Sequence, residues 1–132
     1  MSLRVVAGLL FREGKVLACQ RREDVLFPLK WEFPGGKVEE GETDLAALQR
    51  ELREELAIEV RSATEILRYT YQYPDWKEVE LTFFRVQAYQ GDIDNLAFAS
   101  LAWVRSDQLG SLDFLDGDKT IIEKLGNREI DY

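Results

Sequence analysis

The sequence predicts an α+β fold, an α/β/α sandwich in which a mixed β-sheet lies between helices. Three observations predict it: two apolar strand-like runs open the chain, an amphipathic helix follows, and further strand-like runs precede a short helix near the end. This order is typical of a sheet with helices packed on its faces. At 132 residues, 45% apolar and 32% charged, the chain is predicted to form one domain, residues 1–132, with its own core.

The two opening runs occupy residues 3–11 and 15–20. The link between them ends in Gly14, and glycine readily adopts the positive φ of a hairpin turn. We therefore expect the two runs to pair antiparallel. Residues 21–41 follow as an irregular stretch with two prolines and a glycine pair, and a loop this long within a compact domain usually has a functional role.

The clearest helix is predicted at residues 43–56, with Thr43 at its N-cap. Leucines recur there at spacings of three and four residues and form one apolar face: Leu45, Leu48, Leu52 and Leu56.

The second half of the chain is predicted to be mainly strands. These are expected at residues 58–60, 66–73, 78–89 and 101–104, with a turn at residues 73–76. A short helix is expected at residues 119–125, with Asp118 at its N-cap and Gly126 just after its end.

Two small counts restrict the chemistry. The sequence contains no histidine and a single cysteine, Cys19. It therefore lacks the usual Ser-His-Asp and Cys-His catalytic arrangements, and one thiol cannot build a zinc site of Cys and His ligands. A disulfide framework is also excluded, which fits a reducing compartment. We expect a cytoplasmic protein whose carboxylates carry any catalysis.

The charge balance excludes some partners. Seventeen Lys and Arg against 25 Asp and Glu give a net charge of -8, which disfavours binding to long nucleic acids. A small phosphorylated ligand remains compatible, because a divalent metal ion can bridge carboxylates to phosphate. The apolar residues 5–11 are too few to span a membrane, so we expect no membrane association. The oligomeric state does not follow from the sequence.

Three carboxylates on the first predicted helix are candidates for chemistry. Glu51, Glu54 and Glu55 lie three and four residues apart, so they project from neighbouring positions. Like charges at these spacings repel, which indicates a positive partner. Arg50 and Arg53 can neutralise them in part, and an ordinary salt-bridged helix face is the alternative interpretation.

The segment before this helix favours a binding site. Residues 31–42 contain the pair Gly35 and Gly36, which allows a ligand to approach the backbone closely, and Lys37 beside it can meet a phosphate. Clustered carboxylates bind Mg²⁺ readily, and Mg²⁺ often shares its coordination with substrate phosphates. The pattern therefore predicts a site that hydrolyses a phosphoanhydride.

The same residues closely resemble the box of the Nudix hydrolase family. The family pattern is Gly, five residues, Glu, seven residues, then Arg-Glu-aliphatic-any-Glu-Glu-any-Gly-aliphatic. Every charged position matches here, from Gly36 and Glu42 to the run Arg50-Glu51-Leu52-Arg53-Glu54-Glu55-Leu56-Ala57-Ile58. Residues 31–37 are similar to the segment preceding the box in MutT-type nucleoside triphosphate pyrophosphohydrolases.

The resemblance implies a Nudix-type α/β/α sandwich and Mg²⁺, with Mn²⁺ as a substitute, held by Glu51, Glu54, Glu55 and the carbonyl of Gly36. It also implies that Arg50 orients a glutamate and that Glu42 supports this arrangement. A water molecule would attack phosphorus and a glutamate would take its proton.

The sequence departs from the family at two positions. Ala57 replaces the box glycine, and we expect the helix simply to end with a different turn, since no catalytic atom is lost. MutT-type relatives carry a further glutamate six residues before a strand tryptophan, and that position here is Ala97, with Asp92 and Asp94 nearby. We therefore assign the catalytic base to Glu51, with Glu54 and Arg50 as its catalytic partners.

Substrate contacts are the least specific part of the prediction. Asp118 occupies the place from which relatives bind the nucleobase, although Asp is also a favoured N-cap. Arg21 resembles an arginine that holds the phosphates, Lys37 lies beside the glycine pair, and Phe33 offers a ring for stacking, although such aromatic residues commonly belong to the core.

The sequence thus predicts a Mg²⁺-dependent pyrophosphohydrolase that converts a nucleoside triphosphate, such as 8-oxo-dGTP or a cytidine triphosphate, to the monophosphate and pyrophosphate. Two alternatives stay open: a Nudix hydrolase of another nucleoside diphosphate derivative, and a non-catalytic nucleotide-binding module. An acidic protein-interaction domain would leave the spacing from Gly36 to Glu55 unexplained.

Overall fold

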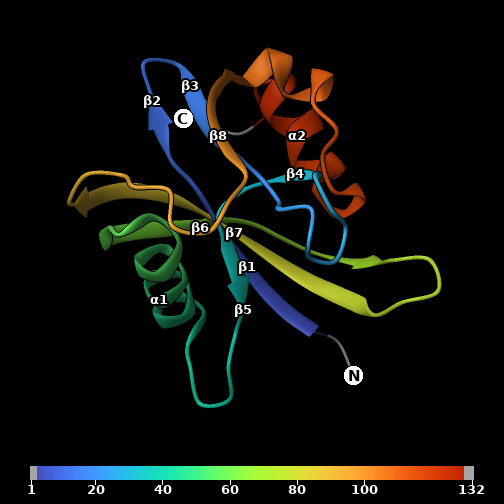
Figure 1. The fold of residues 1–132 in the computed structure, drawn as a ribbon, viewed down its shortest axis with the longest axis horizontal. Coiled ribbons are helices and arrows are strands. Elements are labelled where there is room, and N and C mark those ends of the chain that lie inside the picture. Colours follow the sequence, from blue (N-terminus) through green and yellow to red (C-terminus); the bar gives the residue numbers. More distant parts are fainter. Residues whose placement is uncertain (1–2, 130–132) are drawn as a thin grey trace.

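The computed structural model describes residues 3–129 and contains eight strands, two α-helices and two 3₁₀-helices in that range (Figure 1). In chain order these are β1 (Leu3–Leu9), β2 (Phe11–Arg12), β3 (Lys15–Gln20), β4 (Trp31–Glu32), β5 (Gly35–Lys37), α1 (Asp44–Leu56), β6 (Glu59–Gln72), β7 (Glu78–Gln90), β8 (Ser100–Arg105), η1 (Ser106–Ser111), η2 (Asp116–Asp118) and α2 (Lys119–Gly126).

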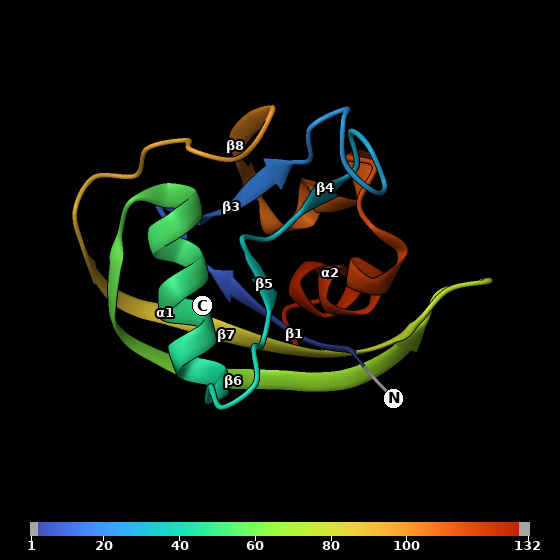
Figure 2. The same cartoon turned by 60° about the horizontal axis from the view of Figure 1, so that its bottom comes forward.

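The strands form two sheets. The first has the order β5-β1-β7-β6, in which β1 and β7 are parallel and the other pairs are antiparallel, so this sheet is mixed. In the second, β3 pairs antiparallel with β2, β4 and β8. The hairpin of β6 and β7 reaches past α2 (Figure 2).

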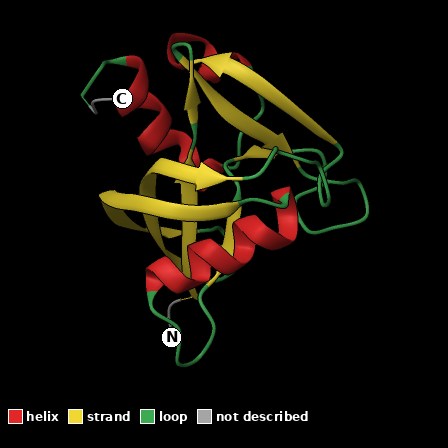
Figure 3. Cartoon of the chain, turned by 90° about the vertical axis from the view of Figure 1, so that its left-hand side faces the viewer, coloured by secondary structure: helices red, strands yellow, loops and turns green. Residues whose placement is uncertain are grey.

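Helices cover both faces of the mixed sheet, as Figure 3 shows. On one face, Val6 and Phe84 pack with Leu48 and Leu52 of α1. On the other face, side chains such as Ala7 and Phe83 pack with Ile121 and Leu125 of α2. Neighbouring strand residues point to opposite faces, so β1 and β7 contribute to both cores. The predicted α/β/α sandwich with a mixed sheet is confirmed.

The expected hairpin of residues 3–11 with residues 15–20 is wrong in part. β1 ends at Leu9 and pairs along its length with β7 in the mixed sheet, whereas only Phe11 and Arg12 pair with β3. The physical reason is burial: Val6 and Leu9 are almost fully buried on opposite faces, so β1 needs a sheet neighbour on each edge and a helix over each face.

The two strands expected at residues 58–60 and 66–73 are a single strand, β6. Its pairing with β7 shifts register between Val60 and Ala63 and again between Glu65 and Leu67. Each β-bulge adds a residue to one strand and interrupts the alternation of apolar and polar side chains. The sequence pattern therefore suggested a break where the strand only bends.

The end of α1 also differs from expectation. The helix begins as predicted, since Thr43 Oγ1 accepts a hydrogen bond from the Ala46 amide at 3.1 Å. At its other end Ala57 adopts the left-handed conformation, φ 60° and ψ 31°, and donates to the Arg53 carbonyl. The chain keeps the backbone that glycine normally provides, at a cost of about 1 kcal/mol. The expectation of a different turn was wrong.

Within residues 3–129, no helix is long and apolar enough to cross a membrane.

Candidate active site

A cavity of about 330 Å³ opens beside the start of β1. It combines charged groups with an aromatic wall. The charged residues that line it are Arg21, Glu32, Lys37, Glu55 and Asp118, and the aromatic ones are Phe27, Phe33, Tyr73 and Trp76. A cavity of this size with few polar groups is typical of a site for a small organic ligand.

Two partly buried carboxyl groups, those of Glu55 and Glu32, line the cavity. Burial, together with the neighbouring Glu32 and Glu51, raises the pKa of Glu55 to about 9, although the Gly35 amide opposes this by donating to Glu55 Oε1 at 3.0 Å. Burial also raises the pKa of Glu32 to about 7, against the effect of Arg21, whose guanidinium donates to both Glu32 oxygens at 3.1 Å. Carboxylates that repel each other in this way favour a cation between them.

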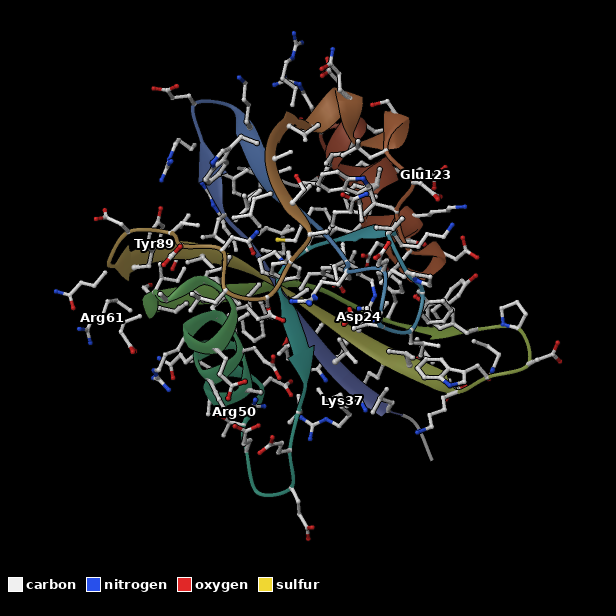
Figure 4. All side chains as sticks on the ribbon, viewed as in Figure 1. Asp24, Lys37, Arg50, Arg61, Tyr89 and Glu123 are labelled. Carbon is white, nitrogen blue, oxygen red and sulfur yellow. The ribbon has the colours of Figure 1, made fainter. Side chains whose placement is uncertain are left out.

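Arg50 holds the neighbouring carboxylates of the helix in place. It donates to both oxygens of Glu42 at 2.8 and 2.9 Å, to Glu51 Oε1 at 2.9 Å and to the Lys37 carbonyl at 2.9 Å. These hydrogen bonds lower the pKa of Glu42 to about 2. Burial raises the pKa of Glu51, and Arg50 opposes that rise. Figure 4 shows Arg50 on α1 and Lys37 on the adjacent β5.

Gly36 lies directly against the Glu51 carboxyl group. A Cβ atom at Gly36 would fall 2.4 Å from Glu51 Cδ, closer than carbon atoms approach. The backbone of Gly36 is itself fixed, because it pairs with Val6 of β1. A residue without a side chain is therefore required for Glu51 to occupy this position.

The third box carboxylate differs from the other two. The Glu54 side chain is 58% exposed and lies 3.5 Å from the Arg50 guanidinium. Among residues 3–129, no three acidic, histidine or cysteine side chains converge as a ready-made metal cage. The candidate metal ligands around Gly36 are nevertheless all oxygen atoms. The pKa values of Glu51 and Glu55, which lie beside the same glycine pair, are both raised. Such a set fits a hard divalent cation that completes its coordination with phosphate and water.

The last helix presents Asp118 to the cavity. Asp118 stands at the N-cap of α2, as predicted, but its side chain makes no capping hydrogen bond. Only 6% of the residue is exposed. Burial raises the pKa of Asp118 well above its usual range; Glu32 raises it further and Arg21 lowers it.

Comparison with known proteins places this geometry in a family. A family model described as the NUDIX domain matches residues 1–125. The chain belongs to the Nudix family. It is 33% identical over 126 residues to the 8-oxo-dGTP diphosphatase of Haemophilus influenzae, which covers 95% of this chain and 92% of that protein. The Escherichia coli CTP pyrophosphohydrolase is 30% identical over 121 residues, 92% and 89% of the two chains.

The fold agrees with this assignment. A crystal structure of the MutT protein from Methanosarcina mazei superposes with a TM-score of 0.85 at 22% identity and covers 98% of this chain and 96% of that one. Together with the similarity in sequence, this makes the chain a MutT-type Nudix hydrolase. Hydrolases of this family use a divalent metal ion.

The structure brings most of the predicted Nudix site residues together, with two qualifications. Phe33 is 3% exposed and packs edge-on against Phe83, so much of its ring belongs to the core although it also lines the cavity. The candidate loop acids do not reach the cavity: Asp92 and Asp94 are exposed, and neither they nor Ala97 lines it.

Two further residues of the cavity, Glu32 and Phe27, were not predicted as site residues. Glu32 lies in the segment before the box, and the signal that could have found it is an acid between Trp31 and Phe33 in an apolar run. Phe27 stacks on Tyr73 at 5.1 Å and covers the cavity from the irregular segment. No local pattern in the sequence indicates that contact.

Proposed function

We propose that this Nudix hydrolase cleaves nucleoside triphosphates to the monophosphate and pyrophosphate, with Mg²⁺ as its metal ion and Mn²⁺ as a substitute. The observation that carries the proposal is the position of the box carboxylates. Glu51 and Glu55 flank the Gly35 and Gly36 backbone at one side of a cavity large enough for a nucleoside. The relatives named as 8-oxo-dGTP diphosphatase and CTP pyrophosphohydrolase support the same reaction class.

The metal ion would be held by Glu51, Glu54, Glu55 and the Gly36 carbonyl. When bound, the metal ion would neutralise the charge of the phosphates and lower the pKa of the attacking water. Glu54 has an exposed side chain and so has room to turn toward the ion.

Glu51 takes the proton from the attacking water in this proposal. Its carboxylate is held on one side by Arg50 and approached on the other by Gly36, so it has little freedom to move. Glu42 keeps the Arg50 guanidinium in the matching orientation through two hydrogen bonds. Fixed orientation of a base toward the reacting atom is worth several orders of magnitude in rate.

The nucleoside would occupy the cavity beyond these carboxylates. Asp118 would contact the base, Arg21 and Lys37 would meet the phosphates, and Phe33 would contribute a wall. Burial raises the pKa of Asp118, which favours its protonated form, and a protonated carboxyl group offers one hydrogen-bond donor and one acceptor. That pair complements the adjacent carbonyl and N–H of a guanine-type edge.

The test is a panel of nucleoside triphosphates, including 8-oxo-dGTP and CTP, incubated with Mg²⁺ and analysed for pyrophosphate and phosphate separately. Pyrophosphate with the matching monophosphate is expected. Release of phosphate alone contradicts the proposal. Saturable binding without turnover on any nucleotide would identify a binding module instead, and turnover only on nucleotide sugars or dinucleoside polyphosphates would identify a hydrolase of other nucleoside diphosphate derivatives.

A further inference from the structure

Two tyrosines hold the residue that precedes Asp118. The Tyr69 hydroxyl, on β6, donates a short hydrogen bond to the Gly117 carbonyl. The Gly117 amide donates to the hydroxyl of Tyr73, just beyond the end of β6, at 3.1 Å. Both backbone polar groups of Gly117 are thus bound by side chains that are far away in the sequence, one on β6 and one just after it.

This contact requires glycine for steric reasons. A Cβ atom at Gly117 would lie 2.6 Å from the Tyr73 hydroxyl oxygen and 3.2 Å from Leu81 Cδ1. Gly117 has no left-handed φ, so its backbone conformation alone does not demand glycine. The close approach of Tyr73 does.

The Tyr69 hydroxyl lies beside the start of α2, because Gly117, to which it donates, is two residues before that helix. The first N–H groups of any α-helix need partners outside the helix. The Asp118 side chain makes no capping bond on α2. Burial raises the pKa of Tyr69. Asp118 lines the cavity, and its carboxyl group does not cap the helix.

The Tyr69 and Tyr73 hydroxyl groups both lie close enough to Asp118 for its charge to affect their pKa values. Burial raises the pKa of Tyr73 to about 12, and the charge of Asp118 raises the pKa of Tyr73 and of Tyr69 as well. Tyr73 lines the cavity, but Tyr69 does not: its ring stacks on Phe83 in the core, with 5.7 Å between ring centroids. Any effect of Tyr69 on a bound nucleotide must therefore pass through Gly117 and Asp118.

We propose that Tyr69, Tyr73 and Gly117 form a clamp that sets the position of Asp118 in the cavity and so determines which nucleobase is accepted. Tyr69 and Gly117 are positioning residues. The inference rests on the proposed function, because it requires that Asp118 contacts the base.

The decisive variant is Tyr69→Phe, which removes one hydroxyl and keeps the ring on Phe83. Tyr89→Phe is the matched control, because it also removes one side-chain hydrogen bond, from Arg12 at 3.1 Å, at the opposite end of the β6–β7 pair (Figure 4). The measurements are kcat and KM for several nucleoside triphosphates with Mg²⁺, and Kd values for the corresponding monophosphates, which do not depend on turnover.

For Tyr69→Phe we expect KM and Kd to rise about five- to tenfold for the best nucleotide, the effect of losing one buried hydrogen bond. We expect kcat within about twofold of wild type and a smaller change for the poorest nucleotide, so that base selectivity narrows. In an Asp118→Ala background, Tyr69→Phe should add nothing, because the two side chains act as a unit. Tyr89→Phe should match wild type.

An equal loss for every nucleotide, or full additivity with Asp118→Ala, would overturn the clamp and leave Tyr69 a role in folding alone. Wild-type protein that hydrolyses no triphosphate defeats the pyrophosphohydrolase proposal, yet the monophosphate Kd values still decide the clamp. Wild-type Kd values that are the same for every base overturn the clamp too. Gly117→Ala should weaken binding of the best nucleotide more than tenfold. If that variant does not fold, the result for Tyr69→Phe decides whether the clamp exists.

Discussion

Replacement of Gly36 by alanine tests the geometry of the active site most directly. The new Cβ atom would fall 2.4 Å from Glu51 Cδ, whereas non-bonded carbon atoms rest about 3.5 Å apart. The Glu51 carboxyl must therefore retreat by about 1 Å, because Gly36 is anchored by its pairing with Val6. The retreat also strains the 2.9 Å hydrogen bond from Arg50.

A misplacement of this size is expected to lower turnover about a hundredfold. Stability should change by only about 1 kcal/mol, because the end of the Glu51 side chain can rotate away. The assay is kcat for pyrophosphate release at saturating nucleotide and Mg²⁺, with the melting temperature measured in parallel. Gly110→Ala is the control, because a Cβ atom there meets nothing within 4 Å. Wild-type turnover in a normally folded Gly36→Ala protein would refute the reasoning.

Three further predictions follow from the same structure. Glu51→Gln should lower turnover about a hundredfold or more with folding retained, and near-normal kcat would contradict its role as the base. Ala57→Gly should raise the free energy of unfolding by about 0.5–1 kcal/mol, because it relieves the left-handed backbone; an unchanged melting temperature would argue against that strain. Arg50 lowers the pKa of Glu42 from 4.5 to about 2, so the stability that ionised Glu42 contributes is present above pH 4.5 and is lost as pH falls through 2. Glu42→Gln should therefore reduce the acid sensitivity of urea unfolding over that window, and an unchanged pH profile would contradict it.

Elements with a regular local pattern were predictable. The leucine spacing predicts a helix at residues 43–56, and α1 spans Asp44–Leu56. The run at residues 78–89 corresponds to β7, Glu78–Gln90. Where bulges interrupt the alternation, as between Glu65 and Leu67 of β6, the pattern indicates a break that the backbone does not make.

In the candidate site, too, some residues were predictable from the sequence and others were not. The carboxylates of α1 and the glycine pair were predictable, because a fixed spacing on one helix and one loop brings them together. Glu32 and the contacts of Gly117 were not, because each depends on a partner distant in sequence: Glu32 on Arg21, and Gly117 on two tyrosines of the β6–β7 hairpin.

The sequence by itself determined the fold class, the chemistry available to a chain without histidine, and the box of residues that marks the Nudix family. Only the tertiary structure decided that β1 lies beside β7, that Asp118 faces the cavity without capping its helix, and that Glu32 lies close enough to Glu55 to raise its pKa. The reason is the range of the interactions. Helix periodicity and motif spacing act over a few residues, whereas desolvation and side-chain hydrogen bonds depend on which distant segments the fold brings into contact.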